Sequence, residues 1–224
     1  MLFSLQVLSS QSQIIVASEE WEDCTNVDGT GLYWDILELV YPNHEIKHKL
    51  VPYSRSVFLV QNKKADLFVA SYYKEAEGVL YPDKDLFFDA DKVVAVYKKG
   101  TEFKGKKSLS GKKVAWIRGY SFDQYFAEKM KKYPLNKRTS AFNMLRYGRI
   151  DFFLNKLEEM ENMKSTLLEG LEYKIIKKLY LYFAFADNEK GKKLLKIYEK
   201  NMKKALRSGE IKRKFEKWQF DYLW

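Results

Sequence analysis

Residues 109–123, with the sequence LSGKKVAWIRGYSFD, combine a short apolar run with a polar, glycine-containing segment on either side. The run Lys113–Ile117 predicts a buried strand because its apolar side chains follow one another without the spacing of an amphipathic helix. The loop 118–122 comes next and is expected to lead into a helix that extends to about residue 132. Backbone N–H groups in such a loop and at the start of a helix bind anions. This stretch therefore predicts one strand–loop–helix step of an α/β fold.

The same alternation continues on the C-terminal side of this stretch. Strands are expected at 135–139, 151–154, 173–176 and 180–186, and helices at 140–148, 156–163, 194–206 and 211–218. The third of these helices carries apolar residues at helical spacing and ends before Gly209. A second α/β unit is therefore predicted beyond residue 111, and the last strand is expected to return the chain to the first unit.

The N-terminal side has an earlier βαβαβ order. Strands are expected at 14–17, 46–51, 66–70 and 93–97, and helices at 32–41 and 54–62. Such an order implies right-handed crossovers and a parallel sheet that binds ligands at the carboxyl ends of its strands. The chain is therefore predicted to be α/β with two lobes, residues 14–92 with 184–224 in the first and residues 93–183 in the second.

The chain is basic, with 40 Lys and Arg against 30 Asp and Glu and a formal net charge of +10. Such a charge is compatible with a nucleic-acid or anionic-membrane partner, because phosphate affinity comes from clustered cations. The lysines are interleaved with Glu and apolar residues along the expected helices, which favours a solvated surface. Recurrent motifs of DNA- and RNA-binding proteins are absent, so no nucleic-acid partner is expected.

Few residues are candidates for metal or redox chemistry. Cys24 is the single cysteine, which excludes an intrachain disulfide and a cysteine zinc cluster. His44 and His48 are expected on a strand, as surface residues and not as a metal pair. We expect neither a metal nor a cofactor.

The N-terminal segment 1–13 has two interpretations. A short apolar run, 1–8, is followed by serines and glutamines, which resembles the tail of a secretory signal peptide without its basic beginning. A frayed first strand explains this segment equally well. The sequence contains no run of about 20 apolar residues, so no membrane-spanning helix is predicted.

Five segments carry a family resemblance through their order and spacing. They are DGTGLYWDIL at 28–37, NKKADLFVAS at 62–71, EGVLYP at 77–82, LSGKKVAWIRGYSFD at 109–123 and LRYGRIDFFLN at 145–155. In this order they resemble the family 3 solute-binding proteins of ABC importers, the class that binds polar amino acids. The resemblance extends from about residue 14 to residue 209, and LSGKKV followed by RGYS and GRID is its most specific part.

The resemblance implies a type II periplasmic-binding-protein fold, in which two α/β lobes are joined by a two-strand hinge. A ligand is then trapped between the lobes by hinge closure. The resemblance also implies a periplasmic monomer that delivers a small polar molecule to an ABC permease and is not an enzyme.

At two positions the sequence departs from the pattern of this family. Where family members place an arginine that holds the ligand α-carboxylate, the matching segment has Glu77. Where they place an aspartate for the α-ammonium, four residues beyond Asp151, the chain has Asn155. Each lost charged hydrogen bond is worth roughly 1.5 to 3 kcal/mol, so a standard α-amino acid is not the expected ligand.

Other positions in the expected site keep usable groups. The candidates are Trp21 as an aromatic wall, Ala70 at the end of a strand, Tyr72 in place of a Ser or Thr, and Arg118, Tyr120 and Ser121 in the loop that enters a helix. Glu77 and Asn155 complete the set. Packing in the core or on the surface remains an alternative role for Trp21, Tyr72 and Arg118.

Other functions on the same scaffold stay open. A dehydratase-like enzyme would use Glu77 as an acid–base group, although no histidine lies near the expected cleft loops and no G-x-S-x-G motif is present. A sensory module would report ligand occupancy to a membrane partner. Glu77 favours a cationic or amine-bearing ligand, whereas Arg118 favours an anion.

Overall fold

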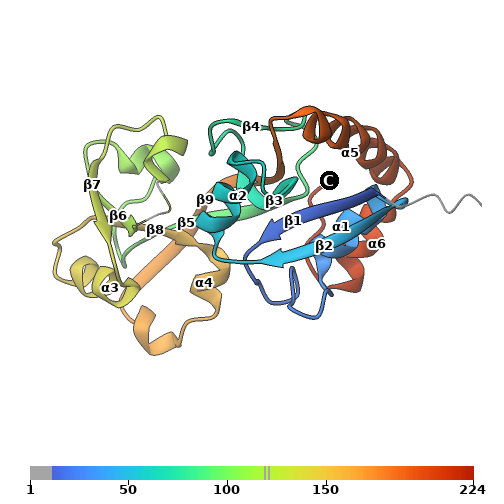
Figure 1. Cartoon of the computed structure of the whole chain (residues 1–224). Coiled ribbons are helices and arrows are strands. Elements are labelled where there is room, and N and C mark those ends of the chain that lie inside the picture. The colour runs from blue at the N-terminus through green and yellow to red at the C-terminus, as the bar shows by residue number, and fades with distance from the viewer. Residues whose placement is uncertain (1–11, 119, 121) are drawn as a thin grey trace, which may run out of the picture. The chain divides into compact units, whose positions relative to one another are not determined.

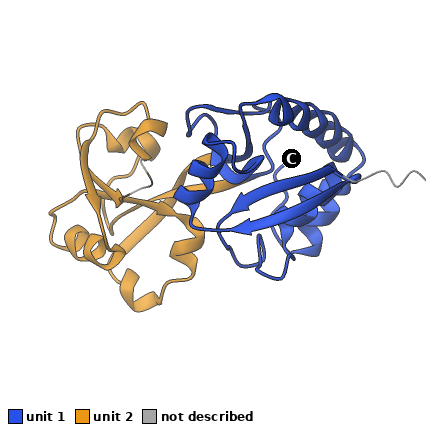
Figure 2. Cartoon of the chain, in the orientation of Figure 1, with its two compact units in different colours: residues 1–89, 180–224 blue, residues 90–179 orange. Residues whose placement is uncertain are grey.

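The computed structural model describes residues 12–118, 120 and 122–224. The chain forms two compact units, residues 1–89 with 180–224 (unit 1) and residues 90–179 (unit 2), which are blue and orange in Figure 2. Two strands contribute residues to both units: β5 (Asp89–Lys98) and β9 (Leu171–Ala186). The elements are labelled in Figure 1.

The sheet of unit 1 has parallel strands at its centre. β1 (Ser12–Ser18) lies between β2 (His44–Leu50) and β3 (Leu67–Tyr72) and is parallel to both. β9 is antiparallel to β3 and also pairs with the short strand β4 (Val79–Leu80). β3 is buried along nearly its whole length, which agrees with the four apolar residues at its start, 67–70.

Four helices belong to unit 1: α1 (Leu32–Val40), α2 (Tyr53–Gln61), α5 (Glu189–Arg207) and α6 (Glu210–Lys217). α1 buries its apolar face and contacts α5 and α6. Asn188 caps α5 by accepting a hydrogen bond from the Gly191 N–H at 2.8 Å. Gly191 is required because a Cβ there would lie 1.9 Å from the carbonyl oxygen of Ala186.

Unit 2 contains the strand order β5–β8–β6–β7. β6 (Lys113–Ile117) is parallel to β7 (Lys131–Leu135) and to β8 (Phe152–Lys156), whereas β5 is antiparallel to β8. α3 (Arg138–Arg146) buries Ala141, Phe142 and Leu145 in a core with residues of β5, β6 and β8. The remaining elements are α4 (Leu157–Glu161) and the 3₁₀ turns η1 (Gly105–Leu109), η2 (Phe122–Tyr125) and η3 (Ser165–Leu168).

The predicted α/β class is confirmed, and the expected elements of residues 14–70 are confirmed with ends that differ by at most two residues. The helix expected between the loop 118–122 and residue 132 is wrong. That segment contains η2 and then β7, whose backbone pairs with β6 from Lys113↔Lys131 onward. Residues 126–130 form neither helix nor strand, and only the last two positions of the expected helix, Lys131 and Lys132, have their backbone groups engaged in the sheet.

The two strands expected at 173–176 and 180–186 form the single strand β9. Lys177, which interrupts the apolar pattern, continues the strand and lies with its ammonium 5.2 Å from the ring centroid of Phe126. The expected signal-peptide remnant, residues 1–13, falls mostly outside the described residues. No helix among residues 12–118, 120 and 122–224 has the length and apolar character needed to cross a membrane.

Candidate ligand-binding site

In unit 1 the polar residues of interest follow the carboxyl ends of β1 and β3. These strands are parallel and adjacent, so the loops after Ser18 and Tyr72 leave the same edge of the sheet. α2 begins at Tyr53, soon after the end of β2, which is parallel to β1. Three separate segments therefore bring side chains to this edge, which we call the unit 1 half-site.

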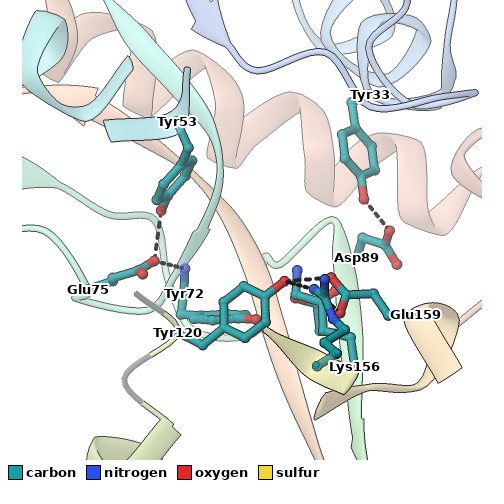
Figure 3. A network of polar contacts seen from close by, with 10 residues as sticks. Tyr33, Tyr53, Tyr72, Glu75, Asp89, Tyr120, Lys156 and Glu159 are labelled. Carbon is teal, nitrogen blue, oxygen red and sulfur yellow. Dashed lines mark hydrogen bonds and ion pairs between the residues drawn. The ribbon is translucent and has the colours of Figure 1, made fainter. Parts of the chain in front are cut away.

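Glu75 is the central charged group of the unit 1 half-site (Figure 3). Its Oε2 accepts hydrogen bonds from the Tyr53 hydroxyl at 2.8 Å and from the Tyr72 N–H at 3.0 Å. A turn directs the side chain back, because the Glu75 N–H donates to the Tyr72 carbonyl at 3.1 Å and Lys74 has φ +58°. Among the residues that the structure describes, Glu75 forms no ion pair with a lysine or arginine, so its negative charge is not neutralised by the protein.

Tyr53 connects Glu75 to the loop after β1. Its N–H donates to Glu19 Oε2 at 3.3 Å, and its ring centroid lies 6.4 Å from that of Trp21. The Trp21 N–H is held by Thr25 Oγ1 at 3.0 Å. Burial and the Glu75 charge raise the pKa of Tyr53 far above its usual value near 10. The hydroxyl therefore stays protonated and donates to the carboxylate.

The end of β3 has an unusual backbone. Ala70 has φ +65°, and the register between β3 and β9 shifts between Phe68 and Ser71. After this shift the Ser71 hydroxyl lies 2.7 Å from the Tyr81 hydroxyl, which accepts a hydrogen bond from the Ala76 N–H at 3.0 Å. Through these hydrogen bonds, Tyr81 connects the loop that contains Glu75 to the end of β3.

In unit 2 the corresponding edge lies at the carboxyl ends of β6 and β8, which are parallel. Tyr120 follows β6, and Glu159 lies in α4, which follows β8 directly. The Tyr120 hydroxyl donates to Glu159 Oε1 at 2.5 Å and accepts from Arg138 at 3.0 Å, and Arg138 forms an ion pair with Glu159. Burial and the bond to Glu159 raise the pKa of Tyr120 to about 12. We call this group the unit 2 half-site.

Lys156 adds a second ion pair to the unit 2 half-site. Its Nζ lies 2.7 Å from Asp91 Oδ2 and 5.6 Å from the centroid of the Tyr120 ring. Lys156 and Tyr120 are labelled in Figure 3. Burial opposes the charge of Lys156, but attraction to Asp91 outweighs burial and raises the pKa of this lysine. Both cations of the unit 2 half-site are therefore paired with carboxylates of the same unit.

Two expected site residues are exposed and have no hydrogen bond to these groups among the described residues. Glu77 is exposed, and its carbonyl oxygen accepts a hydrogen bond from Gln61 at 3.0 Å. Arg118 is also exposed, and its Nε donates to Asn136 Oδ1 at 3.2 Å. Ser121 lies outside the described residues.

Asn155 is fully buried and faces the core of unit 2. Its Nδ2 lies 3.5 Å from the sulfur of Met160, and its Oδ1 has no hydrogen-bond partner among the described residues. Lys156 is the next residue along β8, and successive side chains of a strand point to opposite faces. The side chain of this strand that joins the unit 2 half-site is therefore Lys156 and not Asn155, one residue beyond the expected position.

Glu75, Tyr53, Arg138, Glu159 and Lys156 belong to the half-sites but were not singled out from the sequence. The signal for Glu75 was present, since it lies in the same short segment as Glu77. Among the described residues, no group of three or more His, Cys, Asp or Glu side chains is arranged to hold a metal ion.

No known protein-family model matches the sequence, and no curated protein matches it. Solved structures do match over nearly the whole chain. A histidine kinase sensor domain with similarity to periplasmic binding proteins has a TM-score of 0.67 at 15% identity, covering 93% of this chain and 96% of that one. The chain has the periplasmic-binding-protein fold.

Two further structures with the periplasmic-binding-protein fold come from transport systems. The substrate-binding protein of an amino-acid ABC transporter has a TM-score of 0.60 at 18% identity, with 92% of this chain and 99% of that chain covered. A structure from work on glutathione import through GshT and the cystine ABC importer TcyBC of Streptococcus mutans has a TM-score of 0.63 at 17% identity, with 95% and 97% covered. The resemblance stated from the sequence is thus confirmed at the level of the fold.

Proposed function

We propose that this chain is an extracytoplasmic solute-binding protein that captures a small polar ligand by hinge closure, without chemical turnover. The observation that carries the proposal is the combination of a periplasmic-binding-protein fold with polar side chains at the carboxyl ends of parallel strands in both units. Ligands of open α/β sheets bind at this edge. We further propose that the protein is a periplasmic monomer and that an ABC permease is its partner.

The proposed ligand is not a standard α-amino acid. Among the described residues that form the unit 1 half-site there is a carboxylate, Glu75, and no arginine that could hold an α-carboxylate. A second carboxylate, Glu19, contacts the same tyrosine, Tyr53, from the other side. Because both groups are negative, a cationic or amine-bearing ligand group is the better match for unit 1.

A thermal-shift screen tests this proposal. The panel contains amines, amino acids, short peptides and carboxylates at millimolar concentration, each measured with the full chain. At least one small cationic or amine-bearing solute is expected to raise the melting temperature in a saturable way, because a ligand that binds only the folded state stabilises it. If every panel member leaves the melting temperature unchanged, the proposed ligand capture is wrong.

A sensory role is the second candidate, because a histidine kinase sensor domain has a TM-score of 0.67 to this chain. The two roles share ligand capture and differ in the membrane partner. Cross-linking of the ligand-bound protein to membranes that contain either a candidate permease or a candidate sensor kinase distinguishes them. Stable cross-links to a permease alone support transport.

A further inference from the structure

The excess of positive over negative charge in the chain lies in one unit. Unit 2 contains 21 Lys and Arg against 10 Asp and Glu, whereas unit 1 contains 19 against 20. The net charges are therefore +11 for unit 2 and −1 for unit 1. If the basic residues were spread evenly over the chain, both units would have an excess of Lys and Arg over Asp and Glu. We therefore ask where in unit 2 the excess lies.

A group of lysines, which we call the basal lysines, accounts for most of this excess. Its members are Lys98, Lys99, Lys104, Lys106, Lys107, Lys112, Lys129 and Lys131, and all eight are exposed. They lie at the end of β5, in and around η1, and at the starts of β6 and β7.

The strand register brings these segments to one edge of the sheet. β6 and β7 are parallel and begin together, with Lys113 opposite Lys131. Adjacent backbone bonds join their starts, since Gly111 N–H donates to the Lys129 carbonyl and Lys131 N–H to the Lys112 carbonyl, both at 2.7 Å. The end of β5 reaches the same edge because β5 runs antiparallel to β8.

The basal lysines are opposite the unit 2 half-site. They lie at the amino ends of β6 and β7, whereas Tyr120 and Lys156 lie at the carboxyl ends of β6 and β8. Parallel strands keep these two ends on opposite edges of a sheet. A partner bound to the basal lysines would therefore leave the ligand edge of unit 2 accessible.

Little of this charge is neutralised by the protein. Among the basal lysines, Lys104 alone forms an ion pair within the described residues, with Glu102 at 2.8 Å, and both side chains are strongly exposed. The nearby carboxylates include Glu102, Glu128 and Asp151, the last of which accepts the Lys113 N–H at 2.8 Å. Exposed ion pairs of this kind are weak, so the surface stays cationic.

We propose that the basal lysines dock unit 2 on the surface of an anionic lipid membrane. Segments 98–112 and 129–131 contain lysines and no arginine. The compact charge of lysine suits diffuse attraction to lipid headgroups, while arginine is the usual residue for bidentate phosphate recognition. Segments 98–112 and 129–131 contain one aromatic residue, Phe103, which stacks on Tyr97 at 4.6 Å and is not available to stack on a base. These features favour a membrane over a nucleic acid.

Vesicle flotation of the full chain tests this docking surface. Vesicles of phosphatidylcholine with about 30% phosphatidylglycerol are compared with pure phosphatidylcholine at low and high salt. Binding is expected with the anionic vesicles alone and is lost in high salt, because screening weakens exposed charges. Each lysine near an anionic surface strengthens binding, so replacing Lys106, Lys107, Lys112 and Lys131 together by Gln is expected to weaken binding by at least about tenfold.

A matched variant on unit 1 serves as the control. It replaces Lys193, Lys196, Lys200 and Lys204, four exposed lysines of α5, by Gln and removes the same total charge. It is expected to bind within about twofold of the unmodified protein. The proposal is overturned if both variants lose binding equally, if anionic vesicles do not bind, or if double-stranded DNA at equal phosphate concentration binds more tightly through the same lysines. Ligand binding is measured separately in each variant, so failure here leaves the proposed function untouched.

Discussion

The two half-sites use polar groups in opposite ways. In unit 1, neutral donors from Tyr53 and Tyr72 hold a single carboxylate, Glu75, that has no cationic partner among the described residues. In unit 2, the cations Arg138 and Lys156 are each paired with a carboxylate of the same unit. The comparison shows that Glu75 in the unit 1 half-site has no ion pair among the described residues, whereas both cations of the unit 2 half-site are paired within their own unit.

Because of this difference, we expect substitutions in the two half-sites to have different effects on folding stability and on ligand binding. A largely buried ion pair loses much when one partner is removed, because the other charge stays desolvated. A carboxylate held by neutral donors and partly open to solvent loses less. Substitutions in unit 2 should therefore affect folding first, and substitutions in unit 1 should affect binding first.

The largest expected effect is that of Lys156→Met. The Asp91 carboxylate loses the ammonium 2.7 Å away while it stays largely buried, so the free energy of unfolding should fall by about 3 kcal/mol in urea denaturation. Lys174→Met, at an exposed position of β9, is the control and should change it by less than about 0.5 kcal/mol. If the double variant with Asp91→Asn recovers none of the loss, the pair is not the cause.

Next in size is the effect of Glu75→Gln on ligand binding. The glutamine can still accept the Tyr72 N–H, but it lacks the charge, so affinity for a cationic ligand from the screen should fall about tenfold in calorimetry. Glu77→Gln removes the same charge from an exposed side chain two residues away and should change affinity less than about twofold. Equal losses in the two variants would contradict the assignment of Glu75.

A smaller effect is expected from Tyr120→Phe at alkaline pH. The pKa of Tyr120 is raised from 10 to about 12 in the folded chain, so between these values the unfolded chain loses its proton first and stability falls as pH rises. Removing the hydroxyl should flatten this part of the profile, measured by urea denaturation from pH 9 to pH 11.5. An unchanged slope in the variant would show that Tyr120 titrates alike in both states.

The smallest expected effect is a gain from Ala70→Gly. Ala70 has φ +65°, where glycine is unstrained, so the variant should be more stable by about 0.5 kcal/mol despite the greater freedom of its unfolded chain. Ala115→Gly, at a buried position of β6, is the control and should destabilise the chain. If Ala70→Gly lowers the melting temperature as much as the control does, the backbone at Ala70 is not strained.

The sequence predicts most of the fold because the deciding patterns are local. The apolar run of β3 and the periodic face of α1 identify a buried strand and a one-sided helix without knowledge of their neighbours. β7 has no such local pattern, since its sequence KKYPL is largely exposed and becomes a strand through pairing with β6. The conformation of such a segment depends on its pairing with a distant strand, and this pairing cannot be read from the local sequence pattern.

The half-sites are less predictable because their positions depend on single-residue geometry. A one-residue difference moves a side chain to the other face of a strand, which is why Asn155 is in the core and Lys156 is in the polar network. Glu75 and Glu77 are separated by a turn and not by strand alternation, since Lys74 has φ +58° and Gly78 has φ +68°. The order of motifs in the sequence identifies the segment that contributes to a half-site. The backbone geometry of that segment determines which of its residues lies in the half-site.

Small-angle X-ray scattering with and without the ligand from the thermal-shift screen tests the central claim most directly. Hinge closure around the ligand predicts that the radius of gyration falls on saturation and that Glu75→Gln needs a higher ligand concentration for the same fall. A bound ligand that leaves the scattering profile unchanged at saturation would contradict capture by closure.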